Sequence, residues 1–302
     1  MEQKKYQSIV RLGHRNTIGV LNEGDYIVVQ EKLDGANASF RRDGDIVRAY
    51  SRNHELNEDN NLGGFYQWVQ ENIDAKQLGE ASIFFGEWLN PHKVKYPEYQ
   101  KQFFLYDIYV DDPLYSGYIS FSSVKTVAEA LNLNLIPVFY EGEYKSFEHL
   151  QSFVGKTLIG GRLKDKEMGE GIIVKNTNYR DRHGNQVFVK LVSDEFREVK
   201  KQKPPKDPSK ISEEQMFVNT TVTEARVDKF LHKLVDEGIL DENWGIEDMG
   251  VILKNLGKVI LDDIIKEESD MLPKDYDRKL VKKSIGKTLP KIVKEIIYKY
   301  NK

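Results

Sequence analysis

The chain has 302 residues, of which 39% are hydrophobic and 31% charged, and its formal net charge at pH 7 is −3. A chain of this length and composition can fold around a sizeable core, as one large domain or two ordinary ones. It contains no cysteine, which excludes disulfides, thiol catalysis and cysteine-based zinc sites.

The sequence also shows no membrane, secretion or zinc motif. No apolar stretch is long enough to span a bilayer, and the N-terminal "MEQKKYQSIVRLG" has no long apolar segment of the kind found in secretion signals. The six histidines show neither HxxxH nor HExxH spacing, which argues against a zinc enzyme. We therefore expect a cytoplasmic protein without a membrane partner and, by default, a monomer.

Positive charge is concentrated in two segments. Residues 197–210, "REVKKQKPPKDPSK", carry six basic and two acidic residues, and residues 274–302 carry ten basic and three acidic ones. Local basic patches on an otherwise acidic chain fit a phosphate-bearing partner. A solvated linker and a solvated helix face are the simpler interpretation of charge alone.

The first 200 residues or so carry many short apolar runs separated by turn residues. The sequence predicts three strands within residues 25–52 with turns at Asp34-Gly35 and Asp43-Gly44, strands at 81–89 and 102–110, a helix at 121–132, and a hairpin formed by "EGIIVKN" and "QVFVKLV" around "DRHGN". Strands joined by short turns, with few helices between them, indicate an antiparallel α+β sheet.

The character of the chain changes near residue 203. "KPPKDPSK" is rich in proline and lysine, as an exposed linker is. Beyond it, Thr221 and Glu224 have capping-box spacing, apolar residues at 227–235 follow a 3.6-residue period, and Gly238 ends the helix. Residues 246–268 and 288–300 repeat the pattern. We predict an α+β domain at 1–202, a basic linker at 203–212 and a helical domain at 213–302.

A lysine stands at the end of one predicted strand, directly before a tight turn. In "EKLDGAN" (31–37), Lys32 is followed by Asp34 and Gly35, which would fix the geometry of the loop. A lysine amine attacks phosphorus only when it is deprotonated, a state that burial or nearby positive charge favours. By itself the pattern K-x-D-G is weak, because an ordinary hairpin turn also explains it.

Further polar residues recur within or beside strands that read as buried. They are Arg52 in "SRN", Glu87 in "FFGEW", Tyr106 and Asp107 in "FLYDI", Glu170 and Lys175 in "EGIIVK", and Lys190 in "VFVKLV". Buried charges are costly unless they are paired or meet a charged ligand. Structural salt bridges explain one or two of them, whereas the whole set indicates one cleft for a polyphosphate, a metal and a base.

Taken in order, "EKLDGAN", "SR", "FFGEW", "FFLYDI", "EGIIVK" and "VKLV" resemble the six signature motifs of the covalent nucleotidyltransferases. That superfamily contains DNA ligases, RNA ligases and mRNA capping enzymes. The set is most similar to ATP-dependent RNA ligases of the phage RNA ligase 2 and RNA-editing ligase type. Asn37 matches that branch, and the segment after "VKLV" reads as helical rather than as a β-barrel, with "NTTVTEARVDKFLHKL" resembling the opening helix of the branch's C-terminal domain.

The resemblance implies a fold and a reaction. The fold is an antiparallel-sheet, ATP-grasp-like nucleotidyltransferase domain followed by a small all-helical domain. In the reaction Lys32 attacks the α-phosphate of ATP and becomes lysyl-AMP, AMP passes to a 5′-phosphate of RNA, and a 3′-hydroxyl then displaces AMP. The implied cofactors are ATP and Mg²⁺ or Mn²⁺, and the implied partner is RNA with a nicked duplex, a hairpin or tRNA-like ends.

The resemblance also assigns roles to the site residues. For the base and the sugar, the implied roles are adenine recognition by the backbone carbonyl of Glu31, stacking of Tyr106 on adenine, nucleotide binding by Asn37 and a contact of Glu87 with the ribose. Arg52 would contact the ribose or the 5′-phosphate, and Lys175 and Lys190 would contact phosphates. Glu170 would bind the metal directly or through a water, and Asp34, Gly35 and Asp107 would support the site. A surface acid at Glu31, a strand-end salt bridge at Arg52 and a core tyrosine at Tyr106 stay open as alternatives.

The last motif departs from the pattern. Relatives that seal nicks often carry Lys-x-Lys, whereas this chain has Lys190-Leu191-Val192, so one phosphate-neutralising lysine is missing. Lys200 or Lys201 is a candidate substitute. Strand alternation places Phe188 and Lys190 on one face and their apolar neighbours on the other. The offset from Glu170 to Lys175 is odd, so we expect either a bulge at Gly171 or a wrong assignment.

Nucleic-acid contacts are expected outside the motifs. We assign them to the basic linker and the helical domain, with Lys200, Lys201, Arg226 and Lys229 as candidates and with Arg226 and Lys229 on the exposed side of their helix. Simple packing is the alternative for each. Three other functions compete with an RNA ligase: a minimal DNA ligase, a capping guanylyltransferase and a nucleic-acid-binding protein with a decayed site.

Overall fold

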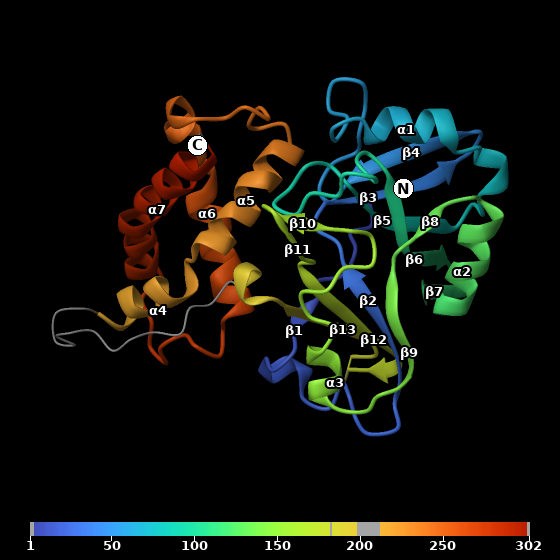
Figure 1. Ribbon diagram of the computed structural model, residues 1–302, viewed down its shortest axis with the longest axis horizontal. Coiled ribbons are helices and arrows are strands. Elements are labelled where there is room, and N and C mark those ends of the chain that lie inside the picture. The colour runs from blue at the N-terminus through green and yellow to red at the C-terminus, as the bar shows by residue number, and fades with distance from the viewer. Residues whose placement is uncertain (1–2, 182, 198–211, 301–302) are drawn as a thin grey trace. The chain divides into compact units, whose positions relative to one another are not determined.

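The computed structural model describes residues 3–181, 183–197 and 212–300 (Figure 1). The chain divides into two compact units, residues 1–193 and 194–302. The first contains antiparallel sheets and helices and the second is helical, so the predicted α+β class is confirmed. The predicted boundary after residue 202 and the linker at 203–212 lie almost wholly outside the described residues and stay predictions. No helix in the described ranges has both the length and the apolar character needed to cross a membrane.

Two sheets form the framework of the first unit. The first sheet has the order β1-β13-β12-β2-β9 and is formed by β1 (Val10–Arg11), β2 (Tyr26–Lys32), β9 (Val138–Glu143), β12 (Gly171–Arg180) and β13 (Gln186–Val192). The second has the order β4-β3-β5-β6-β7 and is formed by β3 (Ala36–Asp43), β4 (Ile46–Ser51), β5 (Ser82–Trp88), β6 (Phe103–Asp112) and β7 (Tyr115–Tyr118), with β8 (Asn134–Leu135) beside β6. A separate pair is formed by β10 (Arg162–Leu163) and β11 (Lys166–Glu167). Only β1–β13 and β6–β8, among the described pairs, are parallel.

Helices cover the outer faces of the two sheets. They are α1 (Phe65–Asn72), α2 (Phe121–Ala130) and α3 (Phe147–Gln151), with short 3-10 turns η1 (Arg15–Thr17) and η2 (Ala75–Gln77). In Figure 1, α1 and α2 lie against the second sheet and α3 lies beside the first. Leu150 of α3 packs into a core with Val29, Ile172, Val174 and Val189 of the first sheet. Ser120 caps α2 by accepting a hydrogen bond from the Ser123 amide, as the predicted helix at 121–132 requires.

The Asp34-Gly35 turn is not the hairpin that the sequence predicts. β2 belongs to the first sheet and β3 to the second, so residues 33–35 carry the chain from one sheet to the other. Gly35 is needed there for space. A Cβ on Gly35 would lie 2.6 Å from the carbonyl oxygen of Trp88, closer than real Cβ atoms approach. The nucleophile candidate Lys32 therefore ends its strand where the two sheets meet.

The strand pairing of the first sheet places its lysines on one face. Lys32 pairs with Gly171, and Lys175 and Lys190 follow at even offsets along the same continuous register. Val189 and its apolar neighbours face α3 instead. The predicted alternation around Lys190 is confirmed. The bulge expected at Gly171 is absent from this pairing. It is not needed, because Glu170 lies before β12 begins and strand alternation does not fix the direction of its side chain.

The second unit is a helical bundle with its own core. Its elements are η3 (Asp194–Phe196), α4 (Glu213–Thr221), α5 (Glu224–Asp236), η5 (Ile246–Asp248), α6 (Met249–Glu267) and α7 (Arg278–Tyr300). Buried aliphatic residues from α4 to α7 form one cluster. The predicted cap at Thr221 is wrong, because Thr223 caps α5 by accepting a hydrogen bond from the Arg226 amide. Gly238 follows the end of α5 with φ of 67°, as predicted.

We expect Gly35→Ala to lower the free energy of unfolding by about 1–3 kcal/mol, because the new Cβ must displace backbone at Trp88. The measurement is urea unfolding followed by tryptophan fluorescence. Gly79→Ala is the control, since its Cβ would approach only the Ser82 side chain, at 2.9 Å from the hydroxyl. Equal stability of the two variants would contradict the close approach at Gly35.

Candidate active site

Lys32 and Glu170 form the centre of the site. The ammonium of Lys32 donates a hydrogen bond of 2.5 Å to the Glu170 carboxylate, and 25% of the lysine side chain is exposed. Burial lowers the pKa of the Lys32 amine, but the nearby carboxylates of Glu170 and Glu87 outweigh burial and raise it. The surroundings of Lys32 therefore favour its charged form. Lys32 is held there as an ammonium.

Glu87 is a second carboxyl group beside Lys32. It lies on β5 and accepts a hydrogen bond of 3.1 Å from the amide of Gly35. Burial raises the pKa of Glu87 to about 7, against the opposing effects of Lys32 and His92. Burial likewise raises the pKa of Glu170, against the effect of Lys32. Two carboxyl groups of raised pKa thus flank one ammonium.

Asp34 connects residues 33–35, which pass from one sheet to the other, to residues 92–96. Its carboxylate accepts a 2.7 Å hydrogen bond from the Val94 amide and lies 3.5 Å from the ring nitrogen of His92. Its own amide donates to the hydroxyl of Tyr96 at 3.0 Å. The supporting role predicted for Asp34 fits these contacts. No pattern in the sequence marks His92 or Tyr96, because their segment "PHKVKYPEY" lies in a loop without periodicity.

Tyr106 is aimed into the site by a β-bulge. The pairing of β5 with β6 runs from Gly86–Leu105 to Phe85–Asp107, so Tyr106 is the extra residue. A regular strand would send Tyr106 and Asp107 to opposite faces, whereas the bulge lets both side chains reach inward. The Tyr106 hydroxyl accepts a hydrogen bond from the Asn37 amide group. Tyr106 is only 9% exposed.

Arg52 brings positive charge to the same side of the second sheet. It follows β4 and lies close enough to Tyr106 and Tyr118 to oppose the rise of their pKa values, which burial causes. No carboxylate among the described residues pairs with Arg52. The alternative of a strand-end salt bridge therefore finds no support in this part of the chain, and the guanidinium is available to an anionic ligand.

Lys175 and Asp107 link the two sheets. The buried ammonium of Lys175, on β12, donates to the Asp107 carboxylate at 2.7 Å and to the carbonyl oxygen of Tyr106 at 2.9 Å. The hydroxyl of Tyr6 donates to the same carboxylate, and its ring lies 4.8 Å from that of Tyr106. Burial lowers the pKa of Lys175 and raises that of Asp107. Sequence reasoning missed Tyr6, which has no motif around it.

The side chain of Glu31 is buried, so the surface-acid alternative is wrong. It is 1% exposed, and one carboxylate oxygen accepts a 2.7 Å hydrogen bond from the Leu158 amide. Burial raises the pKa of Glu31. Glu31 thus anchors the loop at 155–161 to β2, and the amide of Gly169, next to Glu170, donates to the carbonyl oxygen of Gly155 in that loop. Because the side chain is used in the contact with Leu158, Glu31 could contact adenine only through its backbone, as the resemblance implies.

The structure brings Lys190 toward Glu170. Lys190 lies close enough to Glu170 to lower the pKa of that carboxyl group. Val192 pairs with Gly171, which also pairs with Lys32, so a lysine at 192 would share their face. The proposed substitutes Lys200 and Lys201 lie outside the described residues.

Of the nucleic-acid candidates in the second unit, Arg226 is not on an exposed face. Its side chain is 1% exposed and donates hydrogen bonds to Asp263 at 2.5 Å and Glu268 at 2.6 Å. Arg226 lies four residues before Phe230, so both face the core. The prediction that Arg226 is exposed is wrong, and its guanidinium is committed to the bundle. Lys229 is 30% exposed and lies 3.7 Å from Asp263.

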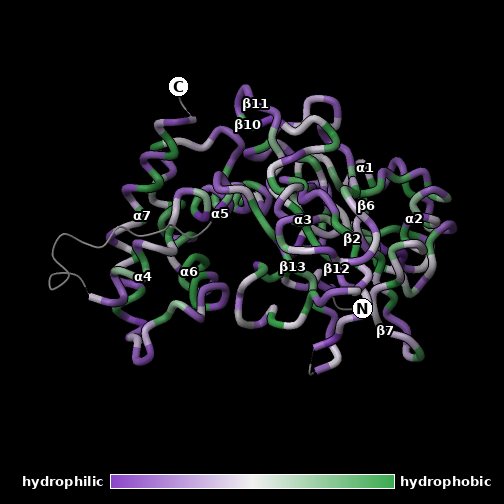
Figure 2. The backbone as a smooth tube through the Cα atoms, turned by 60° about the horizontal axis from the view of Figure 1, so that its bottom comes forward, coloured by the Kyte–Doolittle hydropathy of each residue, from purple (hydrophilic) through white to green (hydrophobic). Residues whose placement is uncertain are grey.

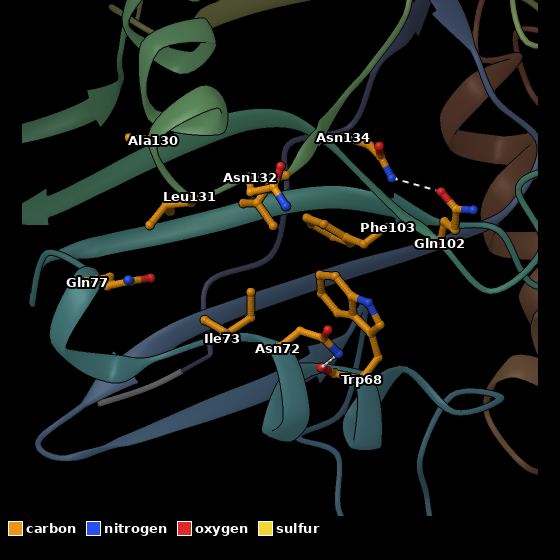
Figure 3. A pocket seen from close by; sticks show the side chains of 11 residues that line it. Trp68, Asn72, Ile73, Gln77, Gln102, Phe103, Ala130, Leu131, Asn132 and Asn134 are labelled. Atoms are coloured by element: carbon orange, nitrogen blue, oxygen red, sulfur yellow. Dashed lines mark hydrogen bonds between the residues drawn. The ribbon is translucent and has the colours of Figure 1, made fainter.

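A separate cavity of about 560 Å³ is lined by residues of α1, β6 and the end of α2 (Figure 3). Its lining includes Trp68, Phe103, Asn72, Gln102 and Asn134, with Asn134 hydrogen-bonded to Gln102 at 3.0 Å. No charged side chain lines it. A triphosphate needs cations, which are found around Lys32 instead. The uncharged lining of this cavity therefore does not suit a triphosphate.

Sequence comparison identifies the family. The sequence model for RNA ligase matches residues 25–192, more than half of the chain. The chain belongs to the RNA ligase family. The range shared with these RNA ligases begins just before β2 and ends with β13, so it contains Lys32, Glu87, Glu170 and Lys190. The predicted likeness to RNA ligases is confirmed at the level of the family.

Solved structures of a Naegleria gruberi RNA ligase are similar to the chain. The form with PPi shares 20% identity over 64% of this chain and 56% of that chain, with a TM-score of 0.43. An arginine-to-alanine mutant with ATP and Mn shares 18% identity over 62% and 55%, with a TM-score of 0.48. The chain thus spans little more than half the length of these proteins. No curated protein sequence matches it.

The raised pKa of Glu87 predicts a pH dependence of stability. Its folded-state value of about 7 exceeds the ordinary 4.5, so its stabilising contribution is complete below pH 4.5 and is lost as pH rises through 7. Glu87→Gln stays neutral. We expect the free energy of unfolding of Glu87→Gln, relative to wild type, to rise by about 1–3 kcal/mol from pH 5 to pH 8.

Urea titrations at several pH values measure this difference. Glu80→Gln is the matched control, because the Glu80 side chain is 81% exposed. Its difference from wild type should not change with pH. A flat difference for Glu87→Gln as well would show that the carboxyl group of Glu87 ionises normally.

Breaking the Lys175–Asp107 pair should destabilise the first unit. Asp107→Asn leaves a buried ammonium without its counter-charge, and we expect a loss of about 3–5 kcal/mol in the free energy of unfolding. Asp43→Asn removes the partner of Arg48 in an exposed pair and should cost no measurable stability. Comparable losses from the two substitutions would contradict the special position of Asp107.

Proposed function

We propose that this RNA ligase is ATP-dependent and joins RNA ends through a lysyl-AMP on Lys32. AMP then passes to an RNA 5′-phosphate, and a 3′-hydroxyl displaces it to form a phosphodiester, so that nicks in duplex or folded RNA are sealed. The observation that carries the proposal is the 2.5 Å contact between Lys32 and Glu170 in a chain that belongs to the RNA ligase family.

The first step follows from this contact. A bond forms between Lys32 Nζ and the α-phosphorus of ATP as the bond from that phosphorus to the bridging oxygen breaks, and pyrophosphate leaves with the electron pair. The ammonium of Lys32 must first lose a proton. Glu170 is the nearest base, and burial raises the pKa of its carboxyl group, which makes it a better proton acceptor than an exposed carboxylate.

Other residues around Lys32 would bind and orient the nucleotide. Arg52 has no acidic partner in the described ranges and supplies charge for the 5′-phosphate or ribose. Tyr106, held by Asn37, offers a ring for adenine. The Lys175 ammonium is already bound to Asp107, so we assign it to positioning Tyr106 through that residue's carbonyl oxygen. Lys190, near Glu170, would contact phosphate.

The carboxylates also fit a shared magnesium ion. No group of three or more potential ligand side chains occurs among the residues that the structure describes. Mg²⁺ is usually held by one or two carboxylates together with phosphates and waters, so Glu170, directly or through a water, would suffice beside a bound triphosphate. When bound, the ion would neutralise charge on the phosphates.

A sealing assay tests the function. The substrate is a nicked duplex with ATP and Mg²⁺, in which the strand that supplies the 3′-hydroxyl is all RNA or all DNA. We expect sealing with RNA only, loss of both sealing and AMP labelling in Lys32→Ala, and normal activity in Lys76→Ala, an exposed lysine outside the site.

The other outcomes separate the alternatives. Equal sealing with DNA would indicate a minimal DNA ligase. AMP labelling without sealing would indicate single-stranded or tRNA-like ends instead of nicks. No labelling of the wild-type protein would contradict the enzymatic function.

The Lys32–Glu170 contact predicts the pH dependence of self-adenylation. Because carboxylates raise the pKa of Lys32, the free amine becomes more abundant as pH increases. We expect the single-turnover rate of AMP labelling to rise from pH 6 to pH 9. Glu170→Gln removes both the proton acceptor and one source of the raised pKa, and should lower the rate at least about tenfold at neutral pH. A Glu170→Gln rate equal to that of wild type would exclude Glu170 as the base.

A further inference from the structure

Helix α7 separates apolar and basic residues onto opposite sides. Its buried residues, among them Val281, Ile285, Leu289, Ile292 and Ile296, face the core of the second unit. Lys283, Lys287, Lys291, Lys294 and Tyr298 form what we call the outer stripe, spaced three or four residues apart and all exposed. Figure 2 shows the same alternation of hydrophilic and hydrophobic residues along α7. The stripe is therefore one continuous helix face.

Most of the stripe's charge is not neutralised by the residues that the structure describes. The only acid in α7 is Glu295, which lies 4.0 Å from Lys291. No ion pair joins the ammonium of Lys283, Lys287 or Lys294 to a residue in the described ranges. Like charges four residues apart disfavour a helix, and basic residues in its first turn oppose its dipole. The stability of the helix therefore does not explain the stripe.

We propose that the outer stripe binds the phosphate backbone of the RNA substrate. This inference goes beyond the adenylation site, since the stripe belongs to the second unit and Lys32 to the first. It rests on the proposed function only in naming RNA as the polyanion.

The shape and composition of the stripe suit a nucleic-acid strand. Its length from Lys283 to Tyr298 is about 22 Å at the rise of an α-helix, enough to follow several phosphates. Lysine ammonium groups contact phosphates without reading the base sequence. Tyr298 is 67% exposed and offers an aromatic ring at the end of the stripe for stacking on a base. On a protein of net charge −3, such a patch also orients an approaching polyanion.

The experiment measures binding apart from catalysis. Fluorescence anisotropy of a labelled nicked RNA duplex is followed with the full chain, without ATP and with a chelator, over a series of salt concentrations. The test variant is Lys283→Gln with Lys287→Gln. The matched control is Lys254→Gln with Lys258→Gln, two exposed lysines of α6 with the same spacing in the same unit.

We expect the test variant to bind RNA at least about tenfold more weakly at low salt. The slope of log K against log salt should become shallower by about 2, because each lost phosphate contact removes about 0.9. The control should bind as wild type does, and Lys283→Arg with Lys287→Arg should retain the affinity because it keeps the charge. Circular dichroism of each variant checks that the helices are intact.

An unchanged affinity and slope in the test variant would overturn the proposal and leave the stripe to an acidic protein partner. An equal loss in the α6 control would overturn it as well, since any lysine pair would then serve. AMP labelling is a separate readout, because Lys32 lies in the first unit. A wild-type protein that is not labelled, yet binds RNA through the stripe, would contradict the proposed function and uphold this inference.

Discussion

The buried ion pair of Lys175 and Asp107 joins the two sheets of the first unit, and the rest of the candidate site depends on it. β12 carries Lys175 and is preceded by Glu170, while β6 carries Asp107 beside the bulged Tyr106. The ion pair therefore holds β12, which follows the proposed base Glu170, at a fixed distance from β6, which carries Tyr106. An apolar pair could fill the same volume, but it would not hold the Tyr106 carbonyl, which the Lys175 ammonium also binds.

The site holds more negative than positive charge around its nucleophile, although its proposed substrate is an anion. Glu170, Glu87 and Asp34 all favour the charged form of Lys32. A triphosphate entering there meets repulsion from the same carboxylates. With a pKa of about 7, Glu87 is partly neutral at physiological pH, which reduces this repulsion. Cations bound to the nucleotide would reduce this repulsion further. They would also weaken the interaction between the Glu170 carboxylate and the Lys32 ammonium.

Local pattern predicted the strands and their faces, because alternation and turn residues act within a few positions. Lys190 shows this, since its face followed from period 2 alone. The predictions failed where a contact with a residue distant in the sequence decides the structure. The Asp34-Gly35 turn has the residues of a hairpin turn, but β3 pairs in the second sheet and not with β2. Arg226 was expected on the exposed face of its helix, whereas it is buried in ion pairs with Asp263 and Glu268. Tyr6 could not be found at all, since its partner lies 101 residues away.

The hairpin of β12 and β13 decides which residues share the Lys32 face of the first sheet. A slip of β13 by one position would turn Lys190 toward α3 and present Val189 in its place. The ladder is regular from Gly171 to Lys175, and its one irregularity in the described pairing falls further out, between Lys175 and Arg180. Added or lost residues near the hairpin tip can be absorbed at that break. The outer end of the hairpin is thus free to vary in length while the inner end keeps its lysines in place.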